Sequence, residues 1–180
     1  MDSLLYTLSE TVHKQNYVIA TYYTRLPREV DILKKAATLA VGQTIGTWIP
    51  IPGITEEIRE KYMGKVVNVF DVPSLELATQ ITEDQREYLI QIAYPSVNFG
   101  TDLPLLITAL LGNDASTSAQ AKLLDIEFSE EFARKFRGPQ YGIKGIQNFA
   151  GINDRPILLN MIKPCTGLTP KEGARIFYET

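Results

Sequence analysis

The segment 86–95, REYLIQIAYP, carries its large apolar residues at every second position. Tyr88, Ile90, Ile92 and Tyr94 therefore lie on one face of an extended chain, because side chains alternate between the two faces of a β-strand. A strand with one apolar face has to bury that face against another layer of structure. The segment thus predicts a sheet covered by other elements, and it excludes a helical bundle.

Strands and helices are expected to alternate along most of the chain. Runs of β-branched and aromatic residues indicate strands, and apolar residues at helical spacing, with charged residues between them, indicate helices. The expected strands lie at residues 17–24, 44–52, 65–72, 86–95 and 121–128, and the expected helices lie at residues 27–42, 55–64, 101–112 and 129–138.

Residues with known capping preferences mark where these helices begin. Pro27 suits the first turn of the first helix, because a proline there sacrifices no hydrogen bond. Thr55, either Thr101 or Asp102, and Ser129 suit the N-caps of the other three. The third helix is so rich in leucine that we expect it to be largely buried.

The character of the sequence changes in its last part. Residues 139–154 are interrupted by glycines and are expected to form a connector with one turn of helix. A final helix is expected at 169–179. Between them the segment 156–162, PILLNMI, is apolar on both faces apart from Asn160, which is typical of strands in parallel α/β sheets. The chain is interpreted as an α+β domain, residues 1–150, followed by the start of a second domain, residues 151–180.

Composition and charge narrow the classes of function. The formal net charge is −3, from 18 basic and 21 acidic residues, which argues against a nucleic-acid-binding protein with its basic face. Cys165 is the only cysteine, so no intrachain disulfide is expected and a cytoplasmic location is predicted. Neither a secretory signal nor a membrane span is expected, because no apolar run approaches about 18 residues.

Several motifs together resemble the RuBisCO large-subunit superfamily over residues 17–180. Gly46-Thr47-Trp48 follows a helix, IAYP at 92–95 precedes one, and the final part contains Gly-Pro, Gly-Ile, Arg-Pro, Lys-Pro and Gly-Leu in order. The resemblance implies an N-terminal α+β domain, with a ferredoxin-like mixed or antiparallel sheet and helices on one face. It also implies a (β/α)8 barrel, of which this chain would hold the first strand and helix.

The departures from true RuBisCO indicate which branch of the superfamily this is. A glutamate, an asparagine, a threonine and a lysine of that enzyme are replaced here by Gly42, Ala109, Met161 and Cys165. The pattern resembles a RuBisCO-like protein that keeps the enolising residues and loses carboxylation. In one branch, the enolase of methionine salvage, a lysine follows the closing glycine of the N-domain helix. That position is Asn113 here, which leaves membership of that branch open.

The candidate site residues come from the motifs that are retained. Lys163 lies where the first barrel strand ends, and the resemblance implies that it is a catalytic base or electrostatic partner; the alternative is a lysine that extends from a strand end into solvent. Thr47 and Trp48 are the candidate phosphate-binding residues, and the alternative is that Trp48 is a core or interface aromatic. His13 is the only histidine, so neither a histidine-based metal site nor a Ser-His-Asp triad is available.

The resemblance also implies a cofactor and a partner. The family binds Mg²⁺ through a carbamylated lysine and two acidic residues after the second barrel strand. No Lys-Asp-Asp-Glu run follows Lys163, so the Mg²⁺ ligands are expected beyond Thr180 and no cofactor is expected in this chain. A homodimer is expected, in which each N-terminal domain lies over the neighbouring barrel, together with a phosphorylated small-molecule substrate.

The function implied for a full-length protein is enolisation, isomerisation or decarboxylation of a phosphorylated keto-sugar or related substrate. We expect the 180-residue chain alone to be inactive, because it lacks the barrel. Two alternatives stay open. One is the N-domain of a divergent, genuine ribulose-1,5-bisphosphate carboxylase, and the other is a non-catalytic dimerisation module.

Overall fold

A computed structural model describes residues 6–7, 9–13, 15–47, 49, 51–73, 84–112, 114–159, 164 and 167–179. The chain divides into two compact units, Met1–Phe136 and Arg137–Thr180. The elements of the first unit are α1 (Ser9–His13), β1 (Tyr17–Pro27), α2 (Ile32–Gly42), α3 (Glu56–Tyr62), β2 (Lys65–Val72), β3 (Gln85–Pro95), the 3₁₀ turn η1 (Ser96–Asn98), α4 (Leu103–Leu111), β4 (Lys122–Phe128) and α5 (Glu130–Ala133). Those of the second unit are α6 (Gly142–Ala150) and α7 (Pro170–Glu179).

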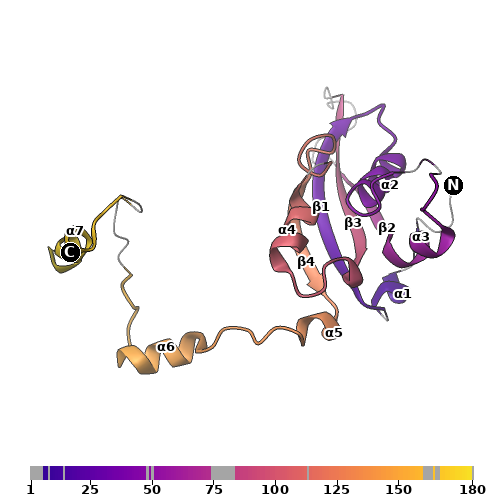
Figure 1. Cartoon of the computed structure of the whole chain (residues 1–180). Coiled ribbons are helices and arrows are strands. Elements are labelled where there is room, and N and C mark those ends of the chain that lie inside the picture. Colours follow the sequence, from indigo (N-terminus) through magenta and orange to yellow (C-terminus); the bar gives the residue numbers. More distant parts are fainter. Residues whose placement is uncertain are drawn as a thin grey trace. The chain divides into compact units, whose positions relative to one another are not determined.

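The first unit is built on one antiparallel sheet with the strand order β2-β3-β1-β4 (Figure 1). The long strands β1 and β3 pair along their whole length, from Tyr17 opposite Pro95 to Pro27 opposite Gln85. Helix α2 connects β1 to β2, and α4 connects β3 to β4. This βαββαβ order is that of ferredoxin-like folds, so the predicted α+β class is confirmed and the sheet is antiparallel.

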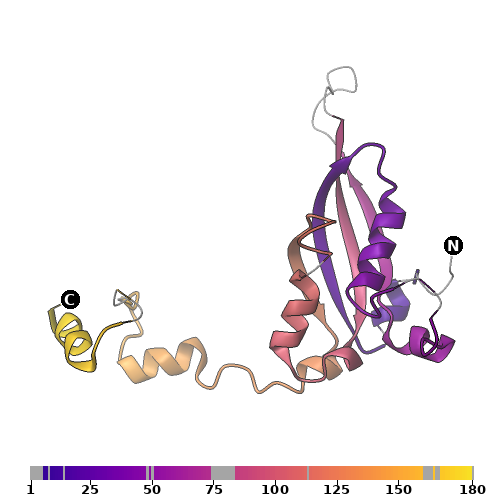
Figure 2. The same cartoon turned by 45° about the horizontal axis from the view of Figure 1, so that its top comes forward.

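Helices α2 and α4 cover the same face of the sheet (Figures 1 and 2). The alternation seen in the sequence is confirmed, since Tyr88, Ile90, Ile92 and Tyr94 are all buried. The opposite face has a small second core, where Val12 of α1 packs on three residues of the sheet. Those three residues are Tyr17, Ile19 and Ala93. The sheet therefore has one thickly covered face and one that α1 covers only in part.

The predicted N-caps are confirmed, because each supplies a side-chain oxygen to an unpaired N–H of the first helical turn. Thr55 accepts from the N–H of Ile58 at 3.3 Å. Asp102 accepts from the N–H of Leu105 at 2.8 Å. For α2 the N-cap is Asp31, which was not predicted from the sequence.

Three local predictions in the first unit are wrong. Pro27 ends β1 and does not begin α2, because the strand pairing continues to that residue and a proline is tolerated at a strand end. The described residues of 44–52 form no strand; Gly46 has φ 82°, a turn conformation. Helix α4 is not largely buried: Leu106 and Leu110 are, whereas Leu105 is 47% exposed. A helix lying on a sheet buries only one stripe of its surface.

The second unit also differs from its predictions. The connector holds a nine-residue helix, α6, where one turn was expected. No strand forms at 156–159, where Leu158 is 96% exposed and Leu159 85% exposed, and residues 160–162 lie outside the described part. A strand needs a neighbour for its backbone hydrogen bonds, and the described residues of this unit supply none. The final helix is confirmed as α7.

Two buried tyrosines anchor α4 to the sheet. The hydroxyl of Tyr22 on β1 donates to the backbone oxygen of Leu110 at 2.9 Å. The Tyr22 and Tyr94 hydroxyl oxygens lie 3.1 Å apart. Because the single Tyr22 proton is already engaged, Tyr94 is the donor to Tyr22. This chain of hydrogen bonds fixes the C-terminal end of α4, where the candidate site lies.

The same tyrosines predict a loss of stability at alkaline pH. Burial raises the pKa of Tyr22 from 10.0 to about 12, and burial also raises the pKa of Tyr94. Both folded tyrosines stay protonated while unfolded tyrosines ionise. Their contribution to stability is therefore complete below pH 10 and is lost as pH rises from 10 toward 12. The free energy of unfolding should fall by about 1.4 kcal/mol per pH unit for each tyrosine.

Urea unfolding between pH 9 and 11 measures this slope. A Tyr22→Phe/Tyr94→Phe variant is the control, because all other titrating groups are unchanged in it. Its unfolding free energy should be lower at neutral pH but less dependent on pH in this range. An identical slope in the two proteins would contradict the assignment of the effect to this pair.

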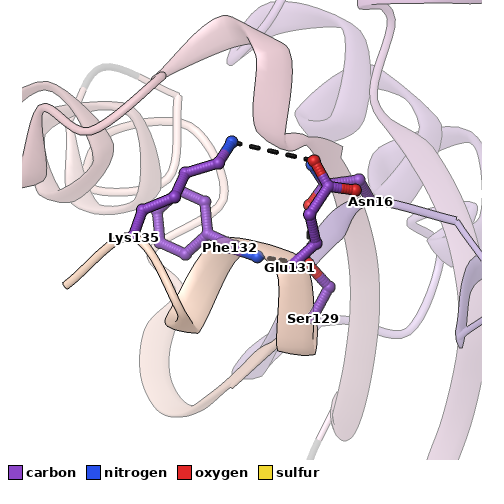
Figure 3. Close-up of polar contacts among 5 residues, drawn as sticks. All are labelled: Asn16, Ser129, Glu131, Phe132 and Lys135. Atoms are coloured by element: carbon purple, nitrogen blue, oxygen red, sulfur yellow. Dashed lines mark hydrogen bonds and ion pairs between the residues drawn. The ribbon is translucent and has the colours of Figure 1, made fainter.

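Asn16, just before β1, holds α5 in place (Figure 3). Its Oδ1 accepts a hydrogen bond from the Ser129 hydroxyl at 2.6 Å. The Ser129 Oγ in turn accepts from the N–H of Phe132 at 3.1 Å, so the predicted cap of α5 is confirmed. The Lys135–Glu131 ion pair of 3.9 Å is exposed and adds little stability. The last helix of the first unit is thereby tied to its first strand.

Candidate functional site

The predicted site residues fall partly within the described chain. Thr47 lies half-buried in the loop after α2, whereas Trp48 and Lys163 are outside the described residues. The Thr47 Oγ1 accepts a hydrogen bond from the N–H of Ile49 at 3.1 Å, which shapes this loop locally. The hydroxyl can still donate its proton, as phosphate binding would require. A phosphate-binding role for Thr47 and Trp48 stays a prediction.

The C-terminal ends of α2 and α4 are joined by one side chain. Gln43, the C-cap of α2, donates through Nε2 to the backbone oxygen of Gly112 at 2.6 Å. Gly112 is in turn the C-cap of α4. Gly42 and Ala109, two of the four replaced positions singled out in the sequence, lie near these two helix ends. The structure therefore brings them to one junction, although they are far apart in the chain.

A cleft of about 440 Å³ opens beside this junction. Two of its polar side chains are held by backbone carbonyls: Asn98 Nδ2 donates to the oxygen of Tyr62 at 2.9 Å, and Thr44 Oγ1 donates to that of Ala40 at 2.8 Å. The described residues that line the cleft include no Asp, Glu, Lys or Arg, so a ligand here meets neutral groups. The lining residues are Gln43, Thr44, Tyr62, Val97, Asn98, Phe99, Leu105 and Ala109.

The loop before β2 packs directly on α2 through a glycine. A Cβ on Gly64 would stand 2.6 Å from the backbone oxygen of Ala40, which is much closer than van der Waals contact. The N–H of Gly64 donates to Thr44 Oγ1 at 3.0 Å. These contacts fix the wall of the cleft that α2 provides, because neither backbone segment can move away without losing its hydrogen bond.

A carboxylate lies over the last residue of α2. A Cβ on Gly42 would stand 2.0 Å from Asp114 Oδ2 and 3.1 Å from its Cγ. The Asp114 carboxylate thus occupies the space in which a side chain at position 42 would begin. It places a negative charge beside the C-terminal end of α2.

Gln43, Asn98 and Asp114 were not predicted from the sequence to lie near this site. Gln43 and Gly112 are 69 positions apart, and no local pattern signals a contact of that range. A polar residue directly after a helix-ending glycine was available as a signal for Gln43. The position of Asp114 against Gly42 depends on how α2 and α4 pack, so only the tertiary structure reveals it.

Two features are absent from the part of the chain that the structure describes, namely a metal-binding cluster and a membrane-spanning helix. No group of three or more His, Cys, Asp or Glu side chains there is placed to hold a metal ion. Nor does any helix among those residues have the length and apolar character needed to cross a membrane.

Comparison with known proteins shows the family to which the chain belongs. Residues 6–132 match the family described as ribulose bisphosphate carboxylase large chain, N-terminal domain. The chain belongs to this family. It is 40% identical, over 96% of its length, to a ribulose bisphosphate carboxylase-like protein of Archaeoglobus fulgidus. It is 39% identical, over 83% of its length, to a 2,3-diketo-5-methylthiopentyl-1-phosphate enolase of Geobacillus thermodenitrificans.

Solved structures of RuBisCO and RuBisCO-like proteins share the fold. An octameric RuBisCO of Pyrococcus horikoshii superposes with a TM-score of 0.67 at 32% identity, covering 91% of this chain and 36% of that one. A RuBisCO-like protein of Alicyclobacillus acidocaldarius superposes with a TM-score of 0.64 at 28% identity, covering 90% of this chain and 39% of that one. The chain spans 39% of the length of the Archaeoglobus relative and 36% of that of the Geobacillus enolase.

Proposed function

We propose that this chain is the N-terminal part of a RuBisCO-like enzyme that enolises a phosphorylated keto compound without fixing CO₂. The observation that carries the proposal is the junction of α2 and α4. Positions 42 and 109, where the resemblance places a glutamate and an asparagine in true RuBisCO, lie in the last turns of these two helices as Gly42 and Ala109. The identity to an enolase of the family supports the same chemistry.

In the proposed reaction Lys163 takes a proton from the carbon next to the substrate carbonyl. The electron pair of the broken C–H bond becomes the C=C bond of the enolate, and the π electron pair of the carbonyl moves onto its oxygen. The lysine must be neutral to accept the proton, which requires burial or neighbouring cations to lower its pKa. Thr47 and Trp48 are proposed to hold the substrate phosphate.

The proposal assigns Mg²⁺, which would stabilise the enolate oxygen, to ligands beyond Thr180. The described residues do not themselves form a metal site. It further assigns residues 151–180 to the start of a barrel domain, and the functional unit to a homodimer in the cytoplasm whose N-terminal domains each cover the neighbouring barrel. Isomerisation or decarboxylation of the same enolate is the alternative outcome within this proposal.

Deuterium exchange tests the proposal. Full-length protein with Mg²⁺ in D₂O should exchange the proton next to the carbonyl of 2,3-diketo-5-methylthiopentyl 1-phosphate or of ribulose bisphosphate, followed by NMR. Lys163→Met should reduce the rate by about 10²–10⁴-fold, the usual contribution of a positioned acid or base. Lys171→Met, on the exposed face of α7, is the matched control and should retain the rate.

The 180-residue chain by itself is expected to show no exchange, because it spans only 39% and 36% of the length of the two relatives. Exchange that survives in Lys163→Met would remove this residue from the mechanism. A full-length protein that exchanges neither compound would refute the proposed enolisation of these substrates.

A further inference from the structure

The C-terminal ends of α2 and α4 are held together by an uncharged side chain. Carbonyl groups at the end of a helix carry a partial negative charge, and neither of these helices has a basic residue in its last turn. The Nε2–H of Gln43 donates to the backbone oxygen of Gly112 at 2.6 Å and brings a partial positive charge to this place. The amide therefore joins two helix ends that would otherwise repel each other.

Gln43 is connected to Thr47 by a short stretch of chain with little freedom. The N–H groups of Thr44 and Gly46 both donate to the backbone oxygen of Val41, at 3.1 Å and 2.9 Å. The first turn of the loop is thus wound against the end of α2, and Thr47 follows it directly. A shift of the chain at Gln43 would therefore be passed on to Thr47.

The other partner of the bond, Gly112, lies in a segment that is fastened to the sheet on both sides. Before it, the last turn of α4 accepts the hydrogen bond of Tyr22 on β1. After it, the buried hydroxyl of Thr24, also on β1, donates to the Ala119 oxygen at 2.6 Å. Gln43 therefore ties the loop after α2 to a fixed point of the domain.

A second contact holds the same loop from another element. The N–H of Gly64, just before β2, donates to Thr44 Oγ1 at 3.0 Å. A segment held at one point can turn about it, whereas a segment held at two points on different elements has a fixed orientation. The loss of the Gln43 bond would thus change the orientation of the loop and would not unfold it.

We propose that Gln43 is a positioning residue, which sets the orientation of the Thr47 loop toward the substrate phosphate. The inference rests on the proposed function, in which Thr47 binds that phosphate; Gln43 itself does not touch the substrate. A displacement of about 1 Å at such a contact lowers a rate by about 10²-fold. The effect on stability is small, because water in the cleft that Gln43 lines can replace the lost hydrogen bond.

The test removes the donor of Gln43 and keeps the length of the side chain. Gln43→Met in the full-length protein should lower kcat/KM for deuterium exchange of the phosphorylated substrate by about 10–10²-fold. Most of the loss should lie in KM, because the weakened contact is to a group that does not react. Thr38→Val is the matched control and should have no effect, since it removes a 2.8 Å hydrogen bond to a backbone oxygen within the same helix.

A double-mutant cycle shows whether Gln43 acts through Thr47. Thr47→Ala should raise KM, and adding Gln43→Met should raise it less than about twofold further, because both changes remove the same contact. Multiplicative effects would overturn the inference, since Gln43 would then act elsewhere. A wild-type KM in Thr47→Ala would overturn it as well, together with the phosphate-binding role of Thr47.

Thermal unfolding separates positioning from a general loss of stability. The Tm of Gln43→Met should stay within about 4 °C of the wild-type value, and a larger fall in proportion to the loss of exchange would overturn the inference. Unchanged kinetics in Gln43→Met would refute this inference alone, whereas no exchange in the wild-type protein would refute the proposed function as well.

Discussion

Full-length protein incubated with ribulose bisphosphate, Mg²⁺ and labelled bicarbonate is expected to place no label in phosphoglycerate. Gly42, Ala109 and Cys165 stand where the resemblance places a glutamate, an asparagine and a lysine in true RuBisCO. None of the three can supply a carboxylate, an amide or an ammonium group. Losing one contact of this kind typically lowers a rate by about 10²–10³-fold.

The expected loss is large because three such groups are replaced. Although such losses do not simply add, carboxylation should fall by at least about 10³-fold. An authentic carboxylase assayed under the same conditions is the positive control. Robust incorporation of label would favour the alternative of a divergent, genuine carboxylase.

Leu110→Ala is expected to lower the free energy of unfolding of the chain by about 3–5 kcal/mol, the range found for leucine-to-alanine changes in well-packed cores. Leu110 has no exposed surface and packs in the main core between α4 and the sheet. Its backbone oxygen also accepts the hydrogen bond of Tyr22. A cavity at this place would loosen the end of α4 that forms the candidate site.

The neighbouring leucine provides a matched control. Leu111 is 45% exposed on the same helix, so Leu111→Ala should cost less than about 1 kcal/mol, because little of its surface leaves water on folding. Urea denaturation followed by circular dichroism measures both variants. Equal losses in the two would mean that α4 packs on the sheet through a different face.

Features that depend on a few neighbouring residues were predicted well. Alternating burial on β3 and the caps supplied by Thr55, Asp102 and Ser129 are local consequences of side-chain geometry. The prediction for Pro27 was wrong because long-range structure decided the outcome. Its preference for a helix start is a local property, but the pairing of β1 with β3 continues through it, and long-range pairing outweighed the local preference.

Predictions that required a partner were less successful. The leucines of α4 indicate a helix, yet only contact with the sheet determines that Leu106 and Leu110 face inward and Leu105 outward. The apolar segment at 156–159 reads as a buried strand, but a strand forms only where another backbone accepts its hydrogen bonds. None of the described residues does so here.

In the candidate site, too, some features follow from the local sequence and others only from tertiary packing. The residue types at positions 42 and 109 could be read from the motifs, because each motif is a short run with fixed spacing. Their meeting at one junction could not be read in this way, since it depends on the hydrogen bond from Gln43 to Gly112 across 69 positions. The carboxylate of Asp114 over Gly42 is likewise a product of helix packing. The local sequence thus determined the helices and strands and where they begin and end. The distances between these elements depend on how the two helices pack on the sheet. Those distances determine which side chains a substrate would meet.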